Sequence, residues 1–389
     1  MTSQTNTPAA EETAVPLDEI EQRLAGCLKQ LQQRGEGPVL RASLSNLVIF
    51  CQWDEVAREI AAEVPAVVAI HPARVLLLVG KPGPEAGSLT ASVCVRQHAA
   101  GADRRIYSEQ VTLRADGRAV ERLPYVVRTL VTADLPINLW WVVPEPPPLA
   151  GPLLFDLAEH AQQIVYDSIG WRAPAHGIMA TAAWLARLQN ESGPGRWRVA
   201  SDLNWRRLKY WRRLTAQALD PGSAPGALGS ITDVLLEHGP HAVVQAWQFA
   251  GWLASRLGWR LKQGLVQPGA ELCWDFQAAQ GSPRLRIRRL ADGPAAIRHL
   301  RIACTLQGKP GALNLAVEGQ HRLSVLPEGN GSVVARTVTV QSQERADLVG
   351  QQLSDRQRDP VFQESMAMAQ AMAQLVTPMD AAGTPPAAP

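Results

Sequence analysis

An aspartate that follows a short apolar segment is the side chain best placed for chemistry in this sequence. Asp167 and Ser168 come directly after a strand expected over residues 164–166. Because ligands of α/β sheets bind beyond the carboxyl ends of the strands, Asp167 could serve a sugar-phosphate- or nucleotide-binding enzyme or sensor. General acid–base catalysis needs a partner group, and the sequence identifies none. We therefore favour the alternative, in which Asp167 caps the turn after the strand.

A second candidate is a segment in which arginine and tryptophan alternate with apolar residues. It reads Asp202-Leu203-Asn204-Trp205-Arg206-Arg207-Leu208-Lys209-Tyr210-Trp211-Arg212. Interleaved basic and aromatic side chains could bind a nucleic acid. However, Trp205 and Trp211 share one helical face with Leu208 and Leu214, which predicts that they are core residues, with Asp202 as the helix N-cap. Tryptophan and arginine also anchor protein interfaces, so an exposed member of this segment is a candidate partner contact.

The third candidate is an expected basic strand, in which Arg284, Arg286 and Arg288 lie on one side. That face could meet an acidic protein surface, but we favour an ordinary solvated face. His238 and His241 are three residues apart, yet Gly239 and Pro240 between them break the helical geometry that a metal pair needs. The sequence contains no Walker A loop, no GxGxxG after a strand, no HExxH and no GxSxG. We therefore expect no catalytic residue, no metal and no cofactor.

Composition narrows the class of protein. The chain has 389 residues, of which 46% are apolar and 19% charged, and its net charge of +2 argues against a nucleic-acid binder. The five cysteines stand singly, as expected in a reducing cytoplasm. Residues 1–15 are polar and do not resemble a signal peptide. The longest apolar run, residues 241–257, contains polar residues and predicts a buried helix, so we expect a cytoplasmic protein without a membrane partner.

The elements that would position these residues alternate between helix and strand in the first half. After a disordered tail over residues 1–15, apolar periodicity predicts an α/β domain over residues 16–170 with a central mixed sheet. Trp140 and Trp141 are neighbours in one strand and should point to opposite faces of it. The expected strands are 43–51, 74–79, 89–96, 106–113, 137–143 and 164–166, and the expected helices are 17–33, 53–63, 118–131 and 153–161. The strand over 106–113 alternates apolar and polar residues, which predicts that it is half exposed.

The second half is predicted to be a domain of helices and a mostly antiparallel sheet over residues 171–342, followed by helices and a flexible tail over 343–389. Turn residues such as Lys309-Pro310-Gly311 separate its apolar runs. The expected helices are 176–189, 199–219, 241–257, 343–354 and 359–376, and the expected strands are 231–236, 271–276, 284–289, 300–306, 312–317, 321–325 and 333–338. The whole chain is thus predicted to have a mixed α/β fold.

Four segments follow one another along the chain in a distinctive order. They are Asp134-Leu135-Pro136 with Trp140-Trp141, then Asp167-Ser168, then the Asp202–Arg212 segment, then Gly251-Trp252-Leu253-Ala254-Ser255-Arg256-Leu257-Gly258-Trp259. In this order the segments resemble those of the OpcA family, the glucose-6-phosphate dehydrogenase assembly proteins. The resemblance covers about residues 40–340. The resemblance implies a cytoplasmic, non-catalytic factor that binds glucose-6-phosphate dehydrogenase and activates it allosterically by promoting its active oligomer, in the oxidative pentose phosphate pathway of carbohydrate metabolism.

The family offers no catalytic residues to carry over, so its matching positions are treated as candidate partner contacts. These are Trp140, Trp141, Asp167, Ser168, Asp202, Trp205, Arg207, Trp211 and Arg212. Photosynthetic members add redox control through a cysteine pair. This chain departs from them, because no cysteine follows Cys304 and no two cysteines are close in sequence. Only Cys273 and Cys304, expected on strands of one sheet, form a pair to watch.

Overall fold

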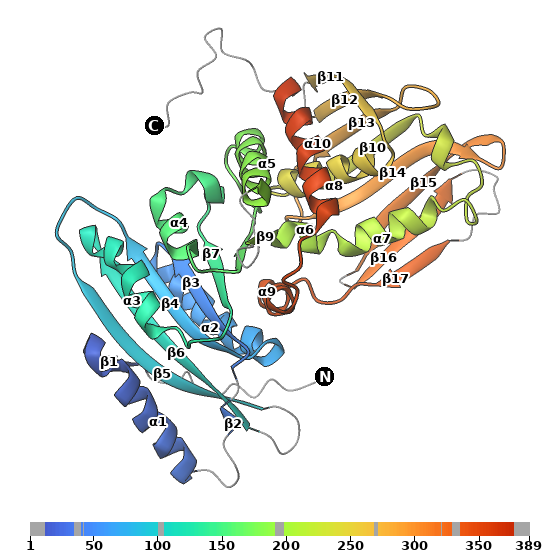
Figure 1. The fold of residues 1–389 in the computed structure, drawn as a ribbon. Helices are drawn as coiled ribbons and strands as arrows, with labels where there is room; N and C mark the ends of the chain where they lie inside the picture. Colours follow the sequence, from blue (N-terminus) through green and yellow to red (C-terminus); the bar gives the residue numbers. More distant parts are fainter. Residues whose placement is uncertain are drawn as a thin grey trace.

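Two large sheets joined by helices form the protein in a computed structural model (Figure 1). The mixed α/β fold predicted from the sequence is confirmed. The division of the chain at residues 170 and 342 stays a prediction. The structure describes residues 12–34, 40–41, 43–99, 105–190, 198–267, 271–319, 321–328 and 335–376.

The first sheet has nine strands, and six of them form a parallel layer in the order β6-β4-β3-β7-β8-β9. Counted along the chain, these six follow the order of a doubly wound, dinucleotide-binding sheet. Antiparallel β5 and β1 extend one edge, and β2 pairs with β6. The strands are β1 (Thr13–Val15), β2 (Leu40–Arg41), β3 (Ser45–Cys51), β4 (Ala73–Lys81), β5 (Leu89–Ala99), β6 (Arg105–Asp116), β7 (Ile137–Val142), β8 (Gln163–Tyr166) and β9 (Val199–Asp202).

Both faces of the parallel layer are covered, because every residue of β3 and β8 is buried. One face packs against α2 and, from the far end of the chain, α9; the other packs against helices of the first half. Trp140 lies in the first of these cores and Trp141 in the second, which confirms that they point to opposite faces. The helices of this half are η1 (Leu17–Glu19), α1 (Ile20–Arg34), α2 (Asp54–Ile70), η2 (Gly117–Arg122), α3 (Leu123–Leu130), η3 (Pro147–Leu149), α4 (Pro152–Ala158) and α5 (Pro174–Asn190).

Three expectations for this half need correction. Of the tail expected to be disordered, residues 1–11 lie outside the described residues, but β1 pairs with β5. Helix α2 does not end at residue 63 but continues through Pro65, which lies inside it. Strand β6 is not half exposed: its polar Ser108, Gln110 and Thr112 are buried. Gln110 and Thr112 donate to the side chain of Glu12, a long-range contact that period-two patterning does not reveal.

The second sheet has eight strands in the order β11-β12-β13-β10-β14-β15-β16-β17. It is antiparallel except where β10 pairs with β13, as the sequence largely predicted. The sequence missed β11, and it assigned residues 309–311 to a turn although they begin β15. The strands are β10 (Asp233–His238), β11 (Arg260–Gln267), β12 (Glu271–Gln277), β13 (Arg284–Arg289), β14 (Ile297–Leu306), β15 (Lys309–Glu318), β16 (Arg322–Glu328) and β17 (Arg336–Thr339).

Helices cover one face of this second sheet (Figure 1). Helix α7 packs on β16, α8 on β10 and β13, and α10 on β11, while α10 also packs along α5 and α8. Each helix in the described part of the chain is too short or too polar to cross a membrane. The helices of this half are α6 (Leu203–Arg207), α7 (Lys209–Ala218), η4 (Leu228–Ser230), α8 (Val243–Arg256), α9 (Arg345–Ser354) and α10 (Pro360–Val376).

Candidate functional site

An ion pair inside the molecule joins the residue after β8 to the last residue of α6. The two terminal nitrogens of Arg207 donate to the two carboxylate oxygens of Asp167, at 2.7 and 2.8 Å. The two side chains are only 10% and 17% exposed. Asp167 also accepts from the backbone N–H of Ile169 at 3.2 Å, which confirms that it caps the turn. With both oxygens engaged, Asp167 is poorly placed to act as a general base.

Asp202 caps α6, as predicted. It also ends β9, so the helix expected over residues 199–219 is wrong for residues 199–202, which form a strand. Its Oδ1 accepts from the backbone N–H groups of Ser168 at 3.1 Å and Asn204 at 2.9 Å. Its Oδ2 accepts from the Gln248 amide at 2.6 Å. Burial, with the nearby Asp167 carboxylate adding to it, raises the pKa of Asp202 to about 6, and the three hydrogen bonds oppose that rise. Asp202 therefore holds the ends of two strands and helix α8 at one point.

Two amide side chains complete this arrangement. Asn204 donates to Ser168 Oγ at 3.0 Å and accepts from Arg207 at 3.0 Å. We call the six residues the Asp202 cluster: Asp167, Ser168, Asp202, Asn204, Arg207 and Gln248. Sequence reasoning selected four of them and missed Asn204 and Gln248. The only signal for Gln248 was its polar side chain within a mostly apolar helical run, and nothing in the sequence set Asn204 apart from its neighbours.

Trp205 and Arg212 lie next to the Asp202 cluster and face α10. The guanidinium of Arg212 stacks 3.5 Å above the Trp205 ring, and the indole N–H donates to Asp359 at 2.7 Å. The ring also contacts Phe362, with centroids 5.2 Å apart. Trp205 is therefore held from three sides and is 6% exposed, while Arg212 keeps part of its surface. These contacts join residues 205 and 359, which precede and follow all the strands of the second sheet in the sequence.

The other predicted site residues are buried. Trp140 and Trp141 are 1% and 2% exposed, and Trp211 is 7% exposed on the apolar face of α7. The structure thus brings together Asp167, Ser168, Asp202 and Arg207 in one cluster, with Trp205 and Arg212 beside it, and leaves Trp140, Trp141 and Trp211 in the core. Whether any of the nine contacts a partner stays a prediction.

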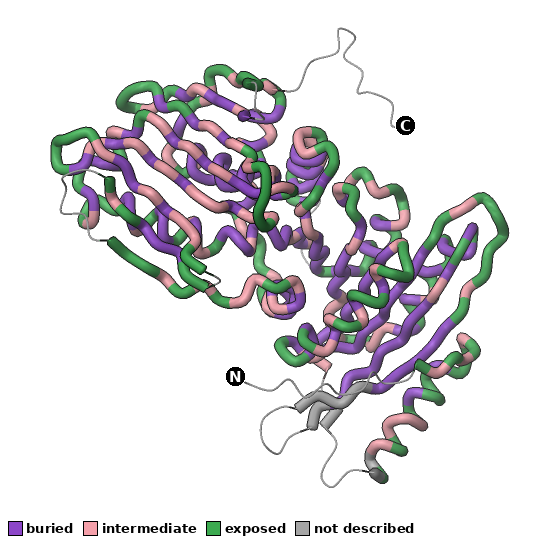
Figure 2. Tube along the Cα trace, turned by 180° about the vertical axis from the view of Figure 1, so that it is seen from behind, coloured by how far each residue is buried: buried purple, intermediate pink, exposed green. Residues whose placement is uncertain are grey.

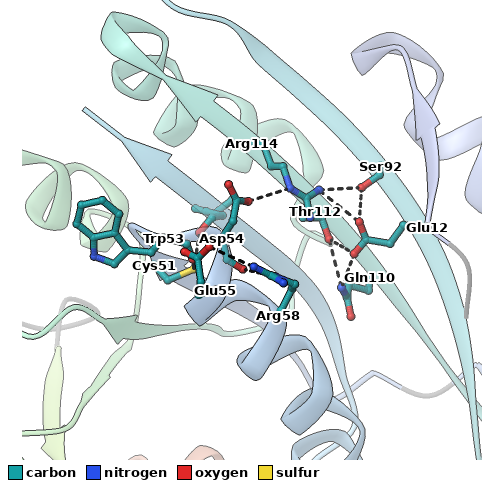
Figure 3. A network of polar contacts seen from close by, with 11 residues as sticks. Glu12, Cys51, Trp53, Asp54, Glu55, Arg58, Ser92, Gln110, Thr112 and Arg114 are labelled. Carbon is teal, nitrogen blue, oxygen red and sulfur yellow. Dashed lines mark hydrogen bonds and ion pairs between the residues drawn. The ribbon is translucent and has the colours of Figure 1, made fainter. Parts of the chain in front are cut away.

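The end of the first sheet where a dinucleotide would bind does not have the residues that such a cofactor needs. In such sheets the first strand is followed by a glycine-rich turn, and the pyrophosphate sits at the N-terminus of the next helix. Here Gln52 and Trp53 follow β3, and Asp54 and Glu55 open α2. Trp53 is 51% exposed, and Asp54 lies 3.5 Å from Arg114 (Figure 3). Two carboxylates at this helix end would repel a pyrophosphate, so the residues do not fit the cofactor.

The histidine pair forms a turn, as favoured from the sequence. The ring of His238 is buried, with its Nδ1 2.7 Å from the backbone oxygen of Gly239, and His241 has a φ of 67°. Burial lowers the pKa of His238, so the ring is neutral near pH 7. Among the described residues, no three His, Cys, Asp or Glu side chains are grouped as a metal site requires.

Two family profiles together cover most of the chain. Residues 64–183 match the profile described as the glucose-6-phosphate dehydrogenase subunit N-terminal domain. Residues 198–366 match the one described as the corresponding C-terminal domain.

Curated cyanobacterial relatives bear the provisional name OxPP cycle protein OpcA. The Synechocystis protein is 31% identical over 283 residues, which are 69% of this chain and 57% of that protein. The Nostoc punctiforme protein is 34% identical over 155 residues, covering 40% of this chain and 31% of the relative. The match therefore spans little more than half of the Synechocystis protein and less than a third of the Nostoc protein.

Solved structures with a related chain path include a levoglucosan dehydrogenase in complex with NADH. It has a TM-score of 0.48 at 12% identity, over 85% of this chain and 95% of that one. KijD10, a 3-ketoreductase from Actinomadura kijaniata in complex with NADP, has a TM-score of 0.47 at 11% identity, over 85% and 96%. Scores and identities this low say nothing about function.

Proposed function

The chain belongs to the OpcA family of glucose-6-phosphate dehydrogenase assembly proteins, and from this premise we propose that it is a cytoplasmic, non-catalytic partner of that dehydrogenase. In this proposal it binds the dehydrogenase and acts as an allosteric activator by promoting the active oligomer. The proposal extends the family's relation to the oxidative pentose phosphate cycle to this chain.

One observation carries the non-catalytic part of the proposal. The first sheet has the strand order of a dinucleotide-binding sheet, yet Asp54 and Glu55 occupy the helix end that would hold the pyrophosphate. Asp167, the other enzyme-like candidate, has both oxygens paired with Arg207. The chain thus has the strand order of a dinucleotide-binding sheet, but the helix end that would hold the pyrophosphate is acidic and the Asp167 carboxylate is already paired.

The direct test is to mix the chain with glucose-6-phosphate dehydrogenase from the same organism and to measure mass and rate together. We expect a larger complex by light scattering and faster NADP reduction by the dehydrogenase. The chain alone should reduce no NADP in the presence of glucose 6-phosphate. An unchanged mass with an unchanged rate would refute the partnership, and NADP reduction by the pure chain would refute the non-catalytic role.

Burial leaves few of the predicted partner-contact residues accessible to a partner. Of the nine family-motif residues, Asp167 and Arg212 retain some exposed surface, and the other seven are buried. We propose Arg212 as the first of the set to test at the interface, because arginine is a common anchor there. Its neighbour Arg213, exposed on the same helix, is the matched control.

A further inference from the structure

A pocket of about 400 Å³ opens between the edge of the first sheet and the segment that joins α9 to α10. Its walls come from β9, the end of α5, helices α6 and α7, and residues 355–363. Five cationic side chains line it: Arg198, Arg206, Lys209, Arg212 and Arg358. We call it the cationic pocket. It lies beside the Asp202 cluster, and only Asp202 belongs to both.

Carboxylates in the wall do not balance these cations. Asp202 directs both oxygens to Ser168, Asn204 and Gln248. One carboxylate oxygen of Asp359 accepts from the Trp205 indole N–H, and the other accepts from the backbone N–H of Phe362. Asp355 lies 3.5 Å from Arg206, the one ion pair within the pocket among the described residues.

The remaining cations lack a carboxylate partner. Among described residues, none lies within 4 Å of Arg198, Lys209, Arg212 or Arg358. Arg212 donates to the backbone oxygen of Trp205, but within the described part of the chain its buried Nε has no hydrogen-bond partner, and neither has the Nε of Arg206. A half-buried guanidinium without an anion has lost water without full replacement, which costs free energy. Burial accordingly lowers the pKa of Arg212 to about 10.

The shape of the site indicates the class of ligand. The volume lies in the range of about 300–1,000 Å³ typical of small-molecule sites, and it exceeds what a bare inorganic anion fills. Leu188 and Phe362 supply apolar wall, and Gln357 and Gln363 supply amide groups suited to hydroxyls. Guanidinium groups match phosphate oxygens, and Arg212 is already oriented by its stack on Trp205.

We propose that the cationic pocket binds a small organic phosphomonoester of sugar-phosphate size. Its phosphate lies against Arg212, Lys209 and Arg358, and its hydroxyl-bearing part lies toward Gln357 and Gln363. The inference concerns the isolated chain and does not depend on the dehydrogenase, so the two proposals fail separately.

The test is calorimetric titration of the full chain with glucose 6-phosphate, inorganic phosphate and glucose at fixed ionic strength. We expect saturable binding of glucose 6-phosphate, weaker binding of phosphate and none of glucose. Lys209→Gln and Arg358→Gln alter exposed side chains, so the fold should be kept. Each should weaken glucose 6-phosphate binding by about tenfold, as expected for one charged hydrogen bond.

Arg213→Gln is the matched control, since it removes the same charge from an exposed position of the same helix outside the pocket. It should change the affinity by less than about twofold. The proposal is overturned if glucose 6-phosphate does not bind saturably, if glucose binds as well, or if Arg213→Gln weakens binding as much as Lys209→Gln.

Discussion

The two sheets differ in how completely their strands are buried. Strands β3 and β8 are buried along their whole length, whereas β10 alternates strictly between buried and half-exposed residues. Figure 2 shows this as continuous purple strands in one sheet and alternating purple and pink in the other. The difference follows from helices on both faces of the parallel sheet and on one face of the antiparallel sheet.

The two sheets also differ in where their charged side chains lie. At the end of the first sheet, charges are internal and few, as in the pair of Asp167 with Arg207. On the open face of the second sheet the arginines of β13 form a ladder. Arg284 pairs with Asp275, Arg286 with Asp233, and Arg288 with Glu271. These three arginines are therefore matched by carboxylates, and the ordinary solvated face favoured from the sequence fits better than an unbalanced positive surface.

The largest effect is expected where helices cover the strands. Trp140→Ala in the first sheet and Trp211→Ala on α7, above the second, should each lower the free energy of unfolding by about 3–5 kcal/mol. Both rings are less than 10% exposed, so cavities would remain. Urea unfolding measures the change. Lost dehydrogenase binding with an unchanged melting temperature would instead place that ring at the partner surface.

Arg207→Met tests the internal pair. Removing the guanidinium leaves Asp167 and Asp202 without their cation in a buried place, so we expect a loss of about 3 kcal/mol in unfolding free energy. Arg213→Met, exposed on the neighbouring helix, is the control and should have little effect. A loss below about 1 kcal/mol for Arg207→Met would mean that water reaches the cluster.

The buried carboxyl predicts a pH dependence. The folded pKa of Asp202, about 6, lies above its ordinary value of 3.8. Its contribution to stability is therefore fully present below about pH 4 and is lost as pH rises through about 6, for a total of about 2–3 kcal/mol. Asp202→Asn should flatten this part of the profile in urea unfolding measured from pH 4 to 7. The Gln248 amide can rotate to accept from the new amide, because its own oxygen has no partner among the residues that the structure describes. An unchanged profile would show that Asp202 titrates normally.

Arg284→Met probes the open face. Its side chain is 52% exposed in the pair with Asp275, and exposed pairs contribute little, so we expect a loss of less than about 1 kcal/mol. The comparison with Arg207→Met is the sharpest contrast between the two regions. Equal losses at the two arginines would mean that the open face is covered in solution.

The smallest effect concerns thiols. Cys273 on β12 and Cys304 on β14 are separated by β13 and β10, so their Cα atoms are at least about 14 Å apart across the sheet, beyond disulfide reach. Burial raises the pKa of Cys304 to about 11 and that of Cys273 above its usual value, which makes both unreactive. Reductant should therefore not change activation of the dehydrogenase. A several-fold redox response that Cys273→Ser abolishes would contradict this.

Local pattern was enough for much of the fold. Apolar spacing predicted α7 with its buried face of Trp211 and Leu214, and the position of Asp202 before that run predicted its capping role. Adjacent placement in one strand was enough to send Trp140 and Trp141 to opposite cores. These features depend on backbone periodicity, which residues a few positions apart determine together.

Tertiary structure decided the rest, because the contacts concerned join distant parts of the chain. Strand β11 carries mostly exposed residues and becomes a strand only by pairing with β12. Helix α9 covers the first sheet, and Asp359 reaches Trp205, although no local pattern brings residues 154 positions apart together. The cationic pocket exists only where these segments meet. The sequence therefore shows its arginines, but not that Arg198, Arg212 and Arg358 have no carboxylate partner among the described residues.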